Sequence, residues 1–251
     1  MVEIGSSAWV ARTGGALGPV DQVRFIVQAI VHELKSLRSG AGGRAWRGRS
    51  PDLTLAPDRL LPDTPIARHV SAYAQALLPE PLLQHSLRSW IWAGMLGDLD
   101  HLAYDNERLY VAALLHDVAL VNHPGPDASC FAVHGAAVAR QIVRDAGASG
   151  PFADTVADAI AAHFNVTVPV SWGAEAHLLH AGTHLDVAGT RRSELATSTL
   201  TEVHARAPRT GFATHFLAAM QQEATSRTNS RAAVLWRLGM GRAIRRHDQR
   251  C

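Results

Sequence analysis

Apolar residues recur with a helical period along most of this chain. Between Asp21 and about Leu37 they fall three and four positions apart, which predicts an amphipathic helix with Asp21 at its N-cap. The same period predicts further helices over about 65–78, 81–97, 107–121, 131–146, 152–163 and 175–187, with two or three more between 191 and 246. No two alternating segments are joined by a turn signal, so the sequence predicts an all-α fold.

Glycine and arginine dominate residues 38–50, a composition typical of a linker or an exposed loop. We therefore expect two parts, an N-terminal helix with a Gly/Arg-rich linker over residues 1–50 and a helical domain over residues 51–251. Residues 1–20 carry no period, which predicts a loose lead-in. The N-terminal helix is a candidate for packing on the main body or on a neighbouring chain, which would make the protein a homo-oligomer.

Length and composition fit one helical domain with extra helices at its two ends. The chain has 251 residues, of which 47% are apolar and 18% are charged. Its net charge of +2 comes from scattered arginines, which does not favour a nucleic-acid partner. The two cysteines form no CxxC pair, and no apolar run approaches the ~20 residues needed to span a bilayer. These features predict a cytoplasmic protein without a membrane partner.

A histidine and an aspartate stand side by side at the end of the apolar run 110–121. His116 and Asp117 are costly to bury unless each finds a partner, and a divalent cation would satisfy both. An antiparallel bundle lets polar side chains from separate helices converge on such an ion. The other polar residues embedded in predicted apolar helices are His85, His163, Asp186 and, less clearly, His134. Nitrogen and carboxylate donors without a thiolate favour Zn, Fe or Mn.

The order His85, then His116-Asp117, then Asp186 resembles the HD-domain superfamily of metal-dependent phosphohydrolases. Six blocks within residues 58–190 are similar to its cyanamide-hydratase-like branch. The blocks are Leu61-Pro-Asp-Thr-Pro-Ile-Ala, Leu83-Gln-His-Ser-Leu-Arg-Ser-Trp, Ala113-Leu-Leu-His-Asp, Phe131 with Gly135-Ala136, Ala159-Ile-Ala-Ala-His163, and Leu179-His-Ala-Gly-Thr-His-Leu-Asp-Val-Ala-Gly189.

The resemblance implies an HD-domain helical bundle that binds one divalent ion per chain. Its implied metal ligands are His85, His116, Asp117 and Asp186. It further implies that Asp117 and His163 are catalytic, because they would orient and deprotonate a water activated by the ion. The implied activity is that of a hydrolase or hydratase acting on a small molecule such as a phosphoester, a nitrile or an amide.

Three further residues are expected at the substrate or behind the ligands. Arg88 lies one turn from His85, where it would pair with an anionic substrate or with a ligand carboxylate. Phe131 and His134 lie in a block where this chain departs from the family branch. Cys130-Phe131-Ala132 replaces the usual Ser-Phe-Glu, and His134 directly precedes Gly135 rather than lying one turn before it.

Two other functions are consistent with the same residues. A dinuclear iron oxygenase of the HD type would need a second ion, and a non-catalytic HD-fold binding protein would fit the missing acidic residue at Ala132. The predicted helix 175–187 has two candidate inward faces. We expect the Asp186 face to point inward, because it also carries small and apolar residues. The stripe of His177, His180 and His184 is then expected at the rim or surface.

Overall fold

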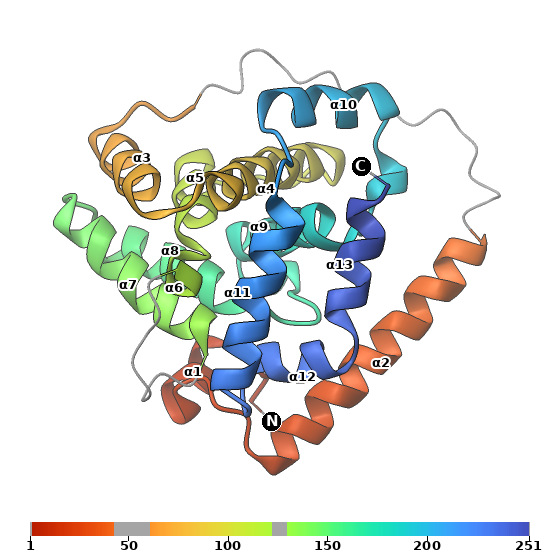
Figure 1. The fold of residues 1–251 in the computed structure, drawn as a ribbon. Coiled ribbons are helices and arrows are strands. Elements are labelled where there is room, and N and C mark those ends of the chain that lie inside the picture. Colours follow the sequence, from red (N-terminus) through yellow and green to blue (C-terminus); the bar gives the residue numbers. More distant parts are fainter. Residues whose placement is uncertain (1, 43–60, 122–129, 251) are drawn as a thin grey trace.

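The computed structural model describes residues 2–42, 61–121 and 130–250 of this chain, and this part contains helices and no strand. The predicted all-α class is therefore confirmed (Figure 1). The helices are α1 (Ser7–Thr13), α2 (Pro19–Gly42), α3 (Pro65–Leu77), α4 (Glu80–Leu99), α5 (Asn106–Leu115), α6 (Val118–Val121), α7 (Phe131–Asp145), α8 (Gly150–His163), α9 (Ala174–Ala188), α10 (Thr197–Arg206), α11 (Phe212–Ser226), α12 (Arg231–Arg237) and α13 (Met240–Asp248). None of them is long and apolar enough to span a lipid bilayer.

The pair α4 and α9 forms the centre of the molecule, with α5 and α8 packed on it and α7 packed on α8. The two central helices approach closely because Gly182 of α9 lies against the backbone of α4. A Cβ atom on Gly182 would lie 2.3 Å from the carbonyl oxygen of Ser89 and 2.8 Å from the amide nitrogen of Ala93. Glycine at this position therefore sets the distance between the two helices that carry His85 and Asp186.

The helix predicted over 107–121 is interrupted at the His116-Asp117 pair. Helix α5 ends at Leu115, His116 occupies its C-cap, and the short helix α6 begins at Val118. The imidazole of His116 bonds the carbonyl of Ala113 at 2.7 Å, where it competes with the main chain for a helical acceptor. The pair consequently lies in a turn between two helices, not within one.

The N-terminal region is more ordered than a loose lead-in. Helix α1 is capped by Ser6 and buries Trp9 completely. The indole N–H of Trp9 donates to the Asp21 carboxylate at 2.9 Å. Because α2 begins at Pro19, Asp21 lies within its first turn and is not its N-cap. One large aromatic side chain thus fixes a segment whose other residues gave no helical period.

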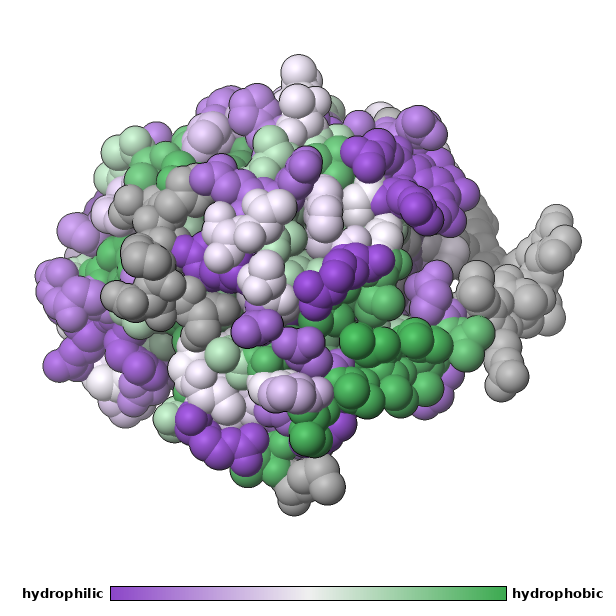
Figure 2. Space-filling model, turned by 60° about the horizontal axis from the view of Figure 1, so that its bottom comes forward, coloured by the Kyte–Doolittle hydropathy of each residue, from purple (hydrophilic) through white to green (hydrophobic). Residues whose placement is uncertain are grey.

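Helix α2 runs along α12 and then extends away from the body of the molecule (Figure 1). It continues to Gly42, so the predicted linker is helical over 38–42, while residues 43–50 lie outside the described part. Six of its apolar residues are 43–71% exposed and form a hydrophobic patch (Figure 2). The patch consists of Val20, Val23, Val27, Ile30, Val31 and Leu34. Packing of this face on a neighbouring chain stays a prediction.

The C-terminal region contains the four helices α10 to α13, where two or three were expected. Helix α11 packs on α4, and α13 packs on α9, so this region covers one end of the central helix pair. Its core side chains Phe212, Phe216 and Met220 are buried. The segment between α10 and α11 carries Arg209, which contacts the central pair directly.

We predict that Gly182→Ala destabilises the fold by about 2–3 kcal/mol, because the new methyl group overlaps backbone atoms of α4 that cannot rotate away. Urea denaturation would measure the loss. Gly150→Ala is the matched control, since its Cβ would meet nothing closer than an Arg144 nitrogen at 3.9 Å. The control should be neutral or slightly stabilising, and an equal loss in both variants would contradict the proposed close approach.

Candidate metal centre

Three side chains bring nitrogen and oxygen atoms to one buried point. His85 comes from α4, while His116 and Asp117 come from the turn between α5 and α6. Nε2 of His116 lies 3.2 Å from Nε2 of His85 and 3.2 Å from Oδ2 of Asp117. Nε2 of His85 lies 3.6 Å from the same carboxylate oxygen. Within the described residues this is the one group of three such donors that could hold a metal ion.

Each of the two imidazoles is oriented by a hydrogen bond on its far nitrogen. Nδ1–H of His116 donates to the carbonyl of Ala113, and Nδ1–H of His85 donates to Oδ2 of Asp186, both at 2.7 Å. Because these acceptors hold the Nδ1 protons, the neutral rings turn unprotonated Nε2 atoms toward each other. Two nitrogen lone pairs and a carboxylate oxygen this close together repel one another unless a positive charge lies between them.

The electrostatics of the three residues also fit a cation. Oδ2 of Asp117 is buried and has no hydrogen-bond partner among the residues that the structure describes. Burial opposes ionisation of this carboxyl, but the neighbouring histidines, His116 above all, lower the pKa of Asp117 to about 2. Burial likewise opposes protonation of His116, yet the charge of Asp117 outweighs it and raises the pKa of His116. A site that draws in positive charge, with two imidazoles and one carboxylate, suits a divalent ion.

Asp186, a predicted metal ligand, lies behind His85 and not beside the three converging atoms. Its Oδ2 accepts hydrogen bonds from His85 Nδ1 and, at 2.9 Å, from Arg88 Nη2. Its Oδ1 accepts from Arg88 Nε at 2.8 Å, from Arg209 Nη1 at 3.0 Å and from Trp92 Nε1 at 3.1 Å. Five donors thus occupy this carboxylate, and it holds His85 in position.

Arg88, predicted to touch either the substrate or a ligand carboxylate, contacts the carboxylate of Asp186. Its guanidinium is fully buried, pairs with Asp186 and also donates to the carbonyl oxygens of Ala207 and Pro208. Burial opposes the charge of Asp186, but the nearby guanidinium of Arg88 lowers the pKa of this carboxyl well below its usual range. The carboxylate therefore stays ionised, and it links α4 and α9 to the segment before α11.

His163 lies next to the converging atoms at the end of α8. Its ring centroid is 5.0 Å from that of His116, and its Nδ1–H donates to the carbonyl of Ile160 at 2.6 Å. Burial lowers the pKa of His163 to about 3, so the ring is neutral and Nε2 is its free acceptor. Phe131 packs edge-on against this ring at 5.8 Å, which supports its orientation.

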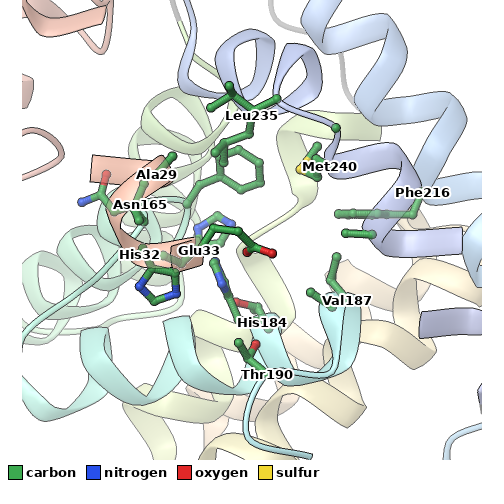
Figure 3. A pocket seen from close by; sticks show the side chains of 18 of the residues that line it. Ala29, His32, Glu33, Asn165, His184, Val187, Thr190, Phe216, Leu235 and Met240 are labelled. Atoms are coloured by element: carbon green, nitrogen blue, oxygen red, sulfur yellow. The ribbon is translucent and has the colours of Figure 1, made fainter. Parts of the chain in front are cut away.

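A cavity of about 430 Å³ opens above the three converging residues. His163 also lines it, and its walls come from α2, α9 and α11 to α13. Figure 3 shows Ala29, His32 and Glu33 of α2 on one side, with Phe216 and Met240 across from them. The cavity therefore connects the candidate metal centre with side chains that lie far from it in the sequence.

Comparisons with known proteins match the middle of the chain. The family model of the HD domain matches residues 82–184. Cyanamide hydratases DDI2 and DDI3 of Saccharomyces cerevisiae are each 30% identical to this chain over 152 residues, which are 59% of this chain and 68% of the relative. The chain belongs to the HD domain family.

The matched HD domain contains His85, His116, Asp117 and His163, whereas Asp186 follows it by two residues. Family membership and the helical fold are thus confirmed as predicted. The roles of the individual residues remain proposals, and for Asp186 the structure favours positioning over ligation.

Two residues of the predicted substrate group lie away from the cavity. His134 is half-buried and does not line it, and Phe131 reaches it only through His163. Ala132 is fully buried and also does not line the cavity. In this arrangement the acidic residue expected there would not form part of the wall.

His32 and Glu33 of α2 line the cavity, although no site residue was predicted in this helix, and so does His184, which was expected at the rim or surface. His184 is half-buried, and its ring is tilted against that of His180 at 4.0 Å between ring centroids. Its one available signal was the spacing of four residues from His180. No local pattern could have placed α2 at the cavity, because α2 reaches it only through tertiary packing.

We predict that Asp186→Asn destabilises the HD domain by about 3–5 kcal/mol, because Arg88 and Arg209 lose the charge that compensates them in the interior. Chemical denaturation would measure the difference. Asp100→Asn is the control, since its bond to Arg191 is solvent-exposed and worth about 1 kcal/mol or less. A loss no larger than that of the control would show that Asp186 is not the charge anchor of the interior.

We also predict that stability falls as the pH drops below about 6.5, the pKa of an unfolded histidine. The unfolded chain then gains a proton that folded His163, with a pKa of about 3, does not accept. Between pH 7 and 5 this residue should account for about 2 kcal/mol of the loss. Denaturation of chelator-treated protein at both pH values would test this, with His163→Asn showing a correspondingly smaller loss. Identical losses in both proteins would refute the assignment.

Proposed function

We propose that this chain is a metal-dependent hydrolase or hydratase in which water attacks a small-molecule substrate. The observation that carries the proposal is the convergence of His85 Nε2, His116 Nε2 and Asp117 Oδ2 at the floor of a cavity of about 430 Å³. Membership of the HD domain family supports it, and so does the similarity to two cyanamide hydratases.

The ion would be held by His85, His116 and Asp117. When bound, a divalent ion would lower the pKa of water and polarise an electrophile. Zn, Fe and Mn all suit two imidazoles and a carboxylate. In the part of the chain that the structure describes there is one such group, which favours one ion per chain over the two that a dinuclear oxygenase would need.

The chain's own residues divide the remaining work. The carbonyl of Ala113 and the carboxylate of Asp186 fix the tautomers of His116 and His85, so that both Nε2 atoms are ready to bind. His163 presents an unprotonated Nε2 beside the centre, where it would accept a hydrogen bond from the attacking water and orient it toward the substrate.

We predict that the wild-type protein, purified without added metal, carries about one ion per chain and that His116→Ala carries none. With one of the three ligands removed, the two that remain should not hold the ion. Turnover of a nitrile or amide should therefore fall by more than about a hundred-fold. Elemental analysis and an ammonia or amide assay would measure the two effects.

His134→Ala is the matched control, since His134 is half-buried and lies outside the cavity lining. It should keep both the ion and the activity, and circular dichroism would confirm that both variants fold. Wild-type protein that takes up no divalent ion, even when it is supplied in excess, would contradict the proposed function.

A further inference from the structure

The cavity is much larger than cyanamide, the molecule in the names of the two relatives. Its volume is about 430 Å³. At about 30 Å³ for each water-sized group, it has room for roughly fourteen non-hydrogen atoms. Cyanamide has three, so it would leave most of the cavity to water. A cavity in this size range is typical of sites for ligands with a substantial body.

Hydrocarbon side chains make up most of the cavity walls, and they come from several helices. Representative members are Ile30, Leu34, Val187, Phe216, Leu235 and Met240. Figure 3 shows Leu235, Met240, Phe216 and Val187 arranged along one side of the space. Water held against such walls is displaced favourably by an apolar group, so the walls select a substrate with a hydrocarbon body.

We infer that the substrate of this site is a nitrile with an apolar body of roughly eight to twelve non-hydrogen atoms. The inference rests on the proposed function for the reacting end of the molecule. The nitrile lies at the floor near His116 and His163, and the hydrocarbon body packs against Phe216 and Leu235.

The reaction is the addition of one water molecule to the carbon–nitrogen triple bond. The water oxygen first bonds to the nitrile carbon while one carbon–nitrogen π bond breaks, and the electron pair of that π bond takes up a proton at nitrogen. The second water proton then moves to nitrogen while the remaining carbon–nitrogen π bond is replaced by a carbon–oxygen π bond. Nε2 of His163 accepts a hydrogen bond from the water and orients it. The product is the carboxamide, with no leaving group and no change of oxidation state that would need a co-reactant.

The test compares three probes on the metal-loaded protein. These are 3-phenylpropionitrile, which has an apolar body, cyanamide, which has none, and benzyl phosphate, which has a similar ring and a charged end. We expect kcat/KM for 3-phenylpropionitrile to exceed that for cyanamide by at least about ten-fold. Calorimetric binding of 3-phenylpropionamide, the uncharged product, gives a readout that does not depend on turnover.

Leu235→Trp tests the position of the body, because the larger side chain fills the space beside Phe216. It should raise KM for 3-phenylpropionitrile and weaken binding of the amide by at least about ten-fold, and kcat/KM for cyanamide should fall less, because cyanamide has no body to place there. Val170→Trp is the matched control, since Val170 is 44% exposed and lies outside the cavity lining. The control should change neither value.

The outcomes separate this inference from the proposed function. Hydration of cyanamide without binding or turnover of the apolar probes would overturn the inference and leave the proposed function standing. Amide binding that Leu235→Trp weakens, without hydration of any nitrile, would overturn the proposed function and support the ligand class. Binding of benzyl phosphate at least as tight as that of the uncharged amide would overturn the inference.

Discussion

The buried ion pair between Asp186 and Arg88 is the constraint on which the rest of the structure depends. A carboxylate in this interior is costly unless donors surround it, and the five that do so come from α4 and from the segment before α11. One of them is the Nδ1–H of His85, so the same network that ties the helices together also fixes the tautomer of this histidine. Fold and site cannot be disrupted separately at this point.

Much of the helical core was predictable from the sequence because its signals are local. The spacing of apolar residues predicted α3, α4, α7, α8 and α9 to within a few residues, whereas α5 and α6 were predicted as one helix. The His116-Asp117 pair stood out because two adjacent polar groups at the end of an apolar run need partners. His85 stood out as a polar residue embedded in a predicted apolar helix.

Other features depended on tertiary contacts that no local pattern records. Asp186 was correctly picked out as a buried polar residue, but its neighbours Trp92 and Arg209 lie 94 and 23 positions away, so its partners were not readable. Helix α1 exists because Trp9 finds Asp21 and a buried site, and α2 borders the cavity because of how it packs on α12. The partners of Asp186, the existence of α1 and the position of α2 all depend on contacts between segments that are distant in the sequence.

The cavity is built from two parts of the chain, one inside the HD domain match and one largely outside it. Its floor, at His85, His116, Asp117 and His163, lies within the segment that defines the family, whereas much of its wall comes from α2 and from residues beyond 184. Substitutions in the wall can accumulate without disturbing the floor. Descendants of one ancestral enzyme can therefore exchange substrates while inheriting the same bond-making chemistry, and overall sequence identity will say less about substrate than the identity of the wall residues alone.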